Sequence, residues 1–198
     1  MKKLLILAVL FLLILSSCSP REPENIITEI TDDNGDIFRL ANNNAVDFYF
    51  YYPENFVIDK NAAMISVQVS DPDFIESELE SGAVFEAPVT PNLSAFVFSM
   101  GANNYDNAAQ YWDEYMKPSY GEIFKDILIE SGEDIEIAGF NGRKYIYTLS
   151  IGGFEYKIAQ ALFIKNREVY TLTYTATPEK FDKHSRVMDV VIDTFEFK

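Results

Sequence analysis

The chain has a single cysteine, Cys18, and its position indicates what the thiol reacts with. It follows Leu15-Ser16-Ser17 at the end of the apolar run Leu4–Leu15, which Met1-Lys2-Lys3 precede. Charged, apolar and small-residue regions in this order are typical of a secretory signal. A helix over this run reaches only about 18 Å, against roughly 30 Å of membrane hydrocarbon. Leu-Ser-Ser-Cys resembles a bacterial lipobox, so we expect a lipoprotein anchored through diacylglycerol and palmitate on Cys18. The alternative is an ordinary signal peptide with an incidental cysteine.

Carboxylates are the second kind of side chain that could do chemistry, and they are abundant. The chain has 31 Asp and Glu against 16 Lys and Arg, which gives a net charge of −15. Such a surface repels phosphate backbones and anionic headgroups, which argues against a nucleic-acid partner. No basic residue occurs between Lys60 and Lys117. We predict that the acidic stretch at residues 71–86 within this interval, with the adjoining loop, docks a protein partner. A solvated surface and a weak site for divalent cations are the alternatives. The candidate binding residues are Asp71, Asp73, Glu76, Glu78 and Glu80.

Catalytic motifs are sparse. His184 is the only histidine, so a Ser-His-Asp site would have to use it, but it lies on the apolar stripe of an expected helix. Asp32-x-Asn34-x-Asp36 matches the first three ligands of a calcium loop, and the match then fails at Ile37. An Asx-rich hairpin turn is the better interpretation. Phosphate-binding glycine loops are absent from the sequence. We therefore expect no cofactor, no metal site and no enzyme, while a hydrolase with two carboxylates stays open.

The domain organisation follows from the same features. Residues 1–17 form the expected signal peptide, and residues 18–25 form the lipidated cysteine and a short tether. Residues 26–198 form one domain, because 48% hydrophobic and 15% aromatic residues provide a sizeable core. No second cysteine is present to form a disulfide.

The elements of the N-terminal half must position any site. Strands are expected at residues 26–31 and 37–41 around the Asn34-Gly35 turn, and at 48–52, 64–69 and 95–99. Phe48–Tyr52 is aromatic on both faces, which favours a strand covered on both sides. A short helix is expected from Asp71-Pro72 to Leu79. The clearest helix has Asn103 as its cap and ends at Pro118. Trp112 and Tyr115 fit the core of this helix better than a ligand site.

The C-terminal half indicates an antiparallel meander. Four strands are expected at residues 134–138, 143–150, 155–164 and 168–175. The predicted turns are Asn141-Gly142, Gly152-Gly153 and Asn166-Arg167. A helix beginning at Thr177-Pro178 and a short strand at residues 194–197 follow. These elements predict an α+β fold in which helices flank a central antiparallel sheet.

The order of these elements carries a resemblance. Tyr52-Pro53, the Gly139–Gly142 turn, and the run Val169–Thr177 that leads through a helix to Asp193-Thr194-Phe195 are its most specific parts. In these segments the chain resembles the PsbP-like (Mog1/PsbP/DcrB) α/β sandwich superfamily, and most of all bacterial lipoproteins with a PsbP-related domain. The resemblance implies the same antiparallel sheet with flanking helices. It implies no single function and no functional residue.

We therefore expect a non-enzymatic accessory or binding module for a membrane or exported protein partner. It would be held on the extracytoplasmic face of the cell membrane by the lipid on Cys18, where tethering raises its effective concentration. A small-ligand protein with an aromatic-lined cleft, or a calcium- or manganese-binding protein of the envelope, is the alternative.

Overall fold

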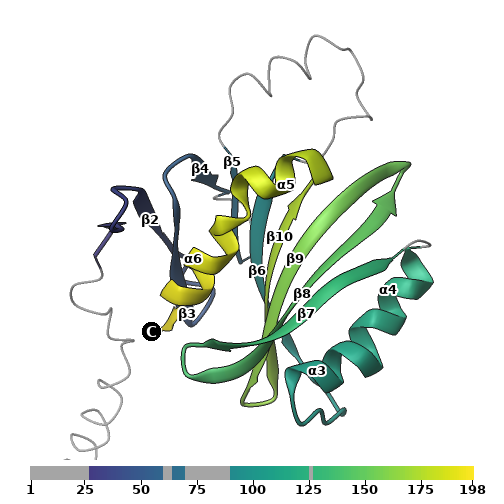
Figure 1. Ribbon diagram of the computed structural model, residues 1–198. Coiled ribbons are helices and arrows are strands. Elements are labelled where there is room, and N and C mark those ends of the chain that lie inside the picture. The colour runs from purple at the N-terminus through teal and green to yellow at the C-terminus, as the bar shows by residue number, and fades with distance from the viewer. Residues whose placement is uncertain (1–26, 60–63, 70–89, 125–126) are drawn as a thin grey trace, which may run out of the picture.

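The computed structural model describes residues 27–59, 64–69, 90–124 and 127–198. Two antiparallel sheets and two groups of helices make up this part of the chain (Figure 1). The larger sheet has seven strands in the order β4-β5-β6-β10-β9-β8-β7. Its strands are β4 (Phe56–Ile58), β5 (Ile65–Val69), β6 (Asn92–Ser99), β7 (Leu128–Ile137), β8 (Phe140–Ile151), β9 (Phe154–Lys165) and β10 (Glu168–Ala176).

The meander predicted for the C-terminal half is confirmed, because β7, β8, β9 and β10 are consecutive neighbours in the sheet. Gly152 and Gly153 turn the chain with φ values of 61° and 89°, and Asn166 and Arg167 do so with 52° and 66°. These positive values are those of the tight hairpin turns that match strand twist.

One predicted turn is wrong. Asn141-Gly142 lies within β8, and the chain turns at Ala138 and Gly139, whose φ values are 49° and 80°. Gly142 serves a different purpose, since a Cβ on it would lie 2.8 Å from the carbonyl oxygen of Leu162 on β9. The glycine therefore permits close approach of two strands.

The predicted helix is present but is longer than expected. It runs as α3 (Ala108–Tyr111), the π-helical turn η1 (Trp112–Met116) and α4 (Lys117–Ile123). Its cap is Asn107 instead of Asn103, because the Asn107 side chain accepts a hydrogen bond from the Gln110 amide at 2.9 Å. Pro118 does not end the helix. The wider π turn precedes the proline, and the Ser119 hydroxyl donates to the Tyr115 carbonyl at 2.7 Å.

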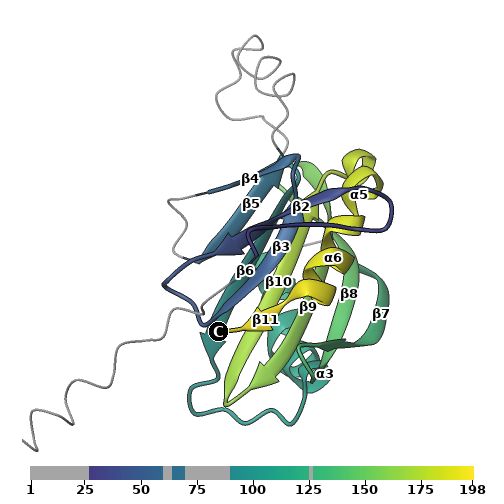
Figure 2. The same ribbon diagram turned by 90° about the vertical axis from the view of Figure 1, so that its left-hand side faces the viewer.

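The second sheet contains four strands in the order β1-β2-β3-β11. They are β1 (Glu29–Thr31), β2 (Ile37–Asn42), β3 (Phe48–Pro53) and β11 (Glu196–Phe197). The predicted hairpin is confirmed, because β1 pairs with β2 around Gly35. The C-terminal helix forms as α5 (Pro178–His184) and α6 (Arg186–Thr194), and α6 packs on β3 and on β10 (Figure 2).

The large sheet separates two cores. On one face Tyr170, Tyr174 and Phe163 pack against β3, α5 and α6. On the other face Tyr145, Tyr147 and Leu149 pack against the helix α3–η1–α4. The predicted antiparallel α+β architecture is confirmed in this coarse form. The strands divide between two sheets, however, so that strands as well as helices cover one face of the larger sheet.

None of the helices in the described residues combines the length and the apolar character needed to cross a membrane. The helix predicted from Asp71-Pro72 to Leu79 lies outside the described residues.

Candidate functional site

The site residues predicted from sequence lie outside the described part of the chain. Cys18 is one of them. The acidic candidates are the others: Asp71, Asp73, Glu76, Glu78 and Glu80. Their roles in lipidation and in binding a partner stay predictions. Within the described residues, no group of three or more His, Cys, Asp or Glu side chains is placed to hold a metal ion.

The calcium-like motif is an Asx turn, as the sequence indicates. The Asp32 carboxylate accepts hydrogen bonds of 2.9 Å from the backbone amides of Asn34 and Asp36. Arg186 of α6 donates to both Asp32 and Asp36. Desolvation by itself would raise the pKa of Asp32. The hydrogen bonds from the Asp36 amide and Arg186 outweigh it and hold this pKa below its ordinary value. A guanidinium therefore lies between the carboxylates that the motif would offer to a cation.

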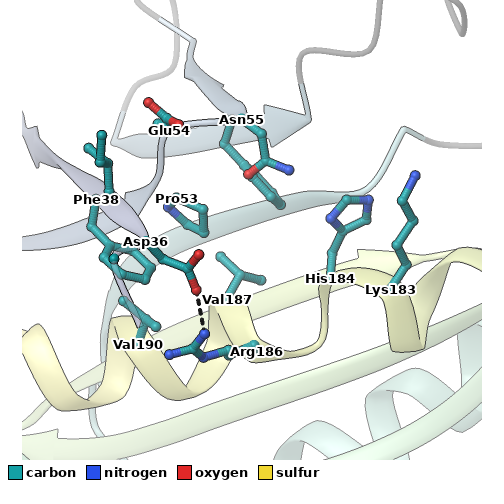
Figure 3. Close-up of a pocket in the computed structure, with 13 residues that line it drawn as sticks. Asp36, Phe38, Pro53, Glu54, Asn55, Lys183, His184, Arg186, Val187 and Val190 are labelled. Carbon is teal, nitrogen blue, oxygen red and sulfur yellow. Dashed lines mark hydrogen bonds and ion pairs between the residues drawn. The ribbon is translucent and has the colours of Figure 1, made fainter. Parts of the chain in front are cut away.

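Arg186 belongs to the wall of a small cavity of about 410 Å³ between the β1–β2 turn, the β3–β4 turn and the C-terminal helices. Figure 3 shows Asp36 directed toward Arg186, with a hydrogen bond of 2.6 Å between them. His184 lines the same cavity and packs edge-on against Phe56, with ring centroids 5.8 Å apart. This histidine lies at the boundary of the core, as the sequence predicts.

A larger groove opens on the opposite face of the large sheet. It has a volume of about 700 Å³ and lies between the helix α3–η1–α4 and the strands β6, β10, β9 and β8. The helix packs on β8 and β9, so the neighbouring strands β6 and β10 form the open floor beside it. The volume is within the range of small-molecule sites in proteins.

Aromatic side chains hold the helix in place and form one wall of the groove. Trp112 is buried and stacks on Tyr145 of β8, with ring centroids 4.2 Å apart. Tyr120 packs edge-on against Trp112 at 6.0 Å. Tyr111 and Tyr115, one turn apart, lie 5.3 Å from each other between their centroids. The core interpretation of Trp112 is confirmed, whereas Tyr115 lies on the groove and is 49% exposed.

Uncharged polar groups form the floor. Gln160 of β9 is 3% exposed and donates from Nε2 to the Thr173 hydroxyl oxygen at 3.0 Å. It also donates to the Tyr120 hydroxyl oxygen at 3.4 Å and accepts a hydrogen bond of 3.2 Å from the Tyr147 hydroxyl. The buried amide thus has partners for both of its ends, which fixes its position.

The described lining of the groove carries no charged side chain. Among the described residues that line it, none is Asp, Glu, Lys, Arg or His. Burial raises the pKa of Tyr111 to about 12. The pKa of Tyr147 is also raised, mainly by burial and to a smaller extent by the neighbouring Tyr120. Both phenols therefore stay neutral at physiological pH. Paired carboxylates, which a glycoside hydrolase would need, are not part of this lining.

The rim of the groove is apolar and reaches solvent. Phe96 and Phe98 stack on each other along β6, with centroids 6.1 Å apart and an angle of 24° between the rings. Phe98 is 47% exposed, Ile151 is 47% exposed and Ile123 is 68% exposed. These exposed apolar side chains all belong to the lining of one groove.

Sequence reasoning missed most of this groove. Thr171, Thr173 and Thr175 alternate with buried apolar residues along β10, a pattern that predicted only a strand. The missed signal was the exposed pair Phe96 and Phe98 at alternate positions of β6, where a solvated face would carry polar residues.

No protein-family profile and no curated protein sequence matches the chain. Solved structures do. Cyanobacterial PsbP (CyanoP) from Synechocystis sp. PCC 6803 superimposes with a TM-score of 0.53 and 13% identity, over 93% of this chain and 99% of that one. The chain has the PsbP-like fold. LpqN of Mycobacterium tuberculosis, described as involved in cell envelope biogenesis, shares the PsbP-like fold at a TM-score of 0.51 and 12% identity, over 86% of this chain and 90% of that one. These identities establish a common fold and leave activity to be argued from the site.

Proposed function

We propose that this chain is a lipid-anchored binding module of the cell envelope, and that the groove between α3–η1–α4 and the large sheet holds an uncharged, largely apolar small molecule. The observation that carries the proposal is the composition of the lining. The chain has 24% charged residues and a net charge of −15, yet none of the described lining residues is charged.

Desolvation supports this choice of ligand. An ionic ligand would lose its hydration in the groove without gaining a charged partner, which is costly. An apolar ligand would cover Phe96, Phe98 and Ile151 and remove their surface from water, which is favourable in proportion to the area covered. The buried polar groups at the floor would fix its orientation.

The envelope location rests on the signal-like N-terminus and Cys18, and the likeness to LpqN is consistent with it. An anchored protein meets membrane-derived apolar molecules at a high local concentration. The groove thus favours the small-ligand alternative raised by the sequence over docking of a protein through the acidic stretch.

Photochemical crosslinking in cells tests the proposal with the full chain. A benzophenone amino acid is placed at Phe98 in the groove, and at Val57 as the control. Val57 is 44% exposed, similar to the 47% of Phe98, and lies on the edge strand β4 away from the groove. We expect a small, neutral adduct at position 98 and none at position 57, as measured by mass spectrometry of the purified protein. Equal adduct yields at both positions, or a charged adduct at position 98, would contradict the proposal.

A further inference from the structure

We infer that the ligand of the groove is an uncharged lipid with a carbonyl group near the middle of its length and an apolar arm on each side, such as a long-chain ester or ketone. This inference rests on the proposed function and specifies its ligand class. Three features of the groove carry it: where the polar groups lie, which hydrogens they offer, and what lies on either side of them.

The polar groups lie across the middle of the groove. Thr173 of β10 is paired in register with Ser94 of β6 and with Gln160 of β9. Paired residues of neighbouring strands lie on the same face with their Cβ atoms about 5 Å apart. Ser94, Thr173 and Gln160 therefore form one cross-strand row, and we call this row the polar band.

The polar band offers hydrogen-bond donors. The Thr173 hydroxyl oxygen already accepts from Gln160, so its hydrogen is left to donate. Among the described residues the Thr173 hydroxyl has no hydrogen bond besides the one from Gln160, and the Ser94 hydroxyl has none. The Thr171 hydroxyl, by contrast, is engaged by the Phe96 carbonyl at 3.4 Å. Two adjacent hydroxyls that need an acceptor match a carbonyl oxygen, which has two lone pairs.

Apolar surface extends from the polar band in both directions. Toward the start of the helix the lining is mostly aromatic and sulfur-containing, with Ser99, Asn103 and Thr171 as polar members. The apolar residues there are Phe96, Phe98, Met100, Tyr105, Tyr111 and Tyr115. Toward the end of the helix the lining is mostly aliphatic and aromatic, with Ser119 and Thr175 as polar members; Thr175 is paired in register with Ile158. The apolar residues there are Ile123, Phe124, Leu149, Ile151 and Ile158. A ligand with its polar group at one end would leave one of these arms unfilled or would bury its polar group in apolar surroundings.

The length of the groove favours an extended ligand. The helix residues on its wall run from Tyr111 to Phe124. At 1.5 Å per residue this stretch is about 20 Å long. A compact ring system would cover only part of that length. A fatty acid fits poorly because none of the described lining residues is a cation that could pair with its carboxylate.

Photoaffinity labelling of the full-length lipidated protein in phosphatidylcholine vesicles tests the inference. Three neutral diazirine probes of equal chain length are used: a ketone with the carbonyl at the centre, a ketone with the carbonyl next to the chain end, and the hydrocarbon alone. We expect the central ketone to label groove peptides about 3- to 10-fold more than either other probe, the advantage of one or two neutral hydrogen bonds.

Matched variants identify the donor. Thr173→Val keeps the shape of the side chain and removes the hydroxyl, and it should reduce labelling by the central ketone to the hydrocarbon level. Thr148→Val makes the same change on β8, at a residue that is not among the described lining residues, and should leave the preference unchanged. Hydrocarbon labelling should be the same in both variants, which shows that the groove is intact.

The outcomes separate the two proposals. Equal labelling of the wild-type groove by all three probes, a preference for the terminal ketone, or equal losses in the two variants would overturn the central carbonyl and leave the proposed function standing. Absence of groove labelling by every probe would overturn both.

Discussion

The indole of Trp112 lies nearly parallel to the phenol of Tyr145, with ring centroids 4.2 Å apart and an angle of 16° between the planes. Trp112 comes from the π-helical turn η1 and Tyr145 from β8, so the stack joins the helix to the sheet. The ring centroids of Trp112 and Tyr147 are also only 5.3 Å apart. This contact sets the separation between helix and sheet, and therefore the width of the groove.

Removing this stack should destabilise the fold. Trp112 is 1% exposed, so we expect Trp112→Ala to lower the free energy of unfolding by about 3–5 kcal/mol, which is typical of deleting a buried aromatic side chain. Tyr115→Ala, on the exposed side of the same helix, should cost less than about 1 kcal/mol. Urea unfolding followed by circular dichroism measures both changes. Similar losses in the two variants would show that Trp112 does not anchor the helix.

Replacing Gln160 by leucine tests the hydrogen-bonded floor of the groove. Gln160→Leu removes the acceptor of the buried Tyr147 hydroxyl and the donor to Thr173. We expect a loss of about 1–3 kcal/mol, the cost of leaving a buried polar group unsatisfied. Unfolding followed by the fluorescence of Trp112, the only tryptophan, measures it. A leucine variant as stable as the wild type would mean that the amide contributes nothing to the floor.

Two glycines should respond to alanine in opposite directions. Gly142→Ala places a Cβ 2.8 Å from the Leu162 carbonyl oxygen, and we expect it to destabilise the protein by about 1–3 kcal/mol through overpacking between β8 and β9. Gly121→Ala in α4 meets nothing within 4 Å, and should stabilise by about 0.4–1 kcal/mol because it reduces the freedom of the unfolded chain. Thermal unfolding of the two variants would contradict this argument if their melting temperatures shifted in the same direction.

Stability should fall in alkaline solution. Burial raises the pKa of Tyr111 to about 12, and burial also raises the pKa values of Tyr147 and Tyr174. Unfolded tyrosines titrate near pH 10, so above about pH 10 the unfolded state loses protons that the folded state retains. The stabilisation is complete below about pH 10 and is lost as the pH rises toward 12.

Urea midpoints measured between pH 8 and 12 test this dependence. Tyr111→Phe removes one of the titrating hydroxyls and should reduce the slope above pH 10. A midpoint that stays constant to pH 12 would contradict the raised pKa values.

Much of the fold follows from local patterns. The strands β8, β9 and β10, their turns at Gly152-Gly153 and Asn166-Arg167, and the hairpin around Gly35 were all predictable. Alternation of side chains and the positive φ of turn residues are properties of neighbouring residues, so the sequence displays them directly. The prediction failed at Pro118 and Gly142. A proline usually ends a helix, but at Pro118 a preceding π turn lets the helix continue. An Asn-Gly pair usually marks a turn, but Gly142 lies inside a strand, where it allows a close approach to the neighbouring strand.

The sequence by itself determined the antiparallel meander, most of the other strands, the acidic character and the expected processing at Cys18, but not the short strand β4. Only the tertiary structure decided that the helix covers β8 and β9 and leaves β6 and β10 open beside it. The groove joins Phe98, Tyr120, Gln160 and Thr173, which are far apart in the chain. Pairing of β6, β10 and β9 brings Phe98, Thr173 and Gln160 to one face of the sheet. Packing of the helix through Trp112 and Tyr145 then adds Tyr120, and no local pattern in the sequence relates these residues.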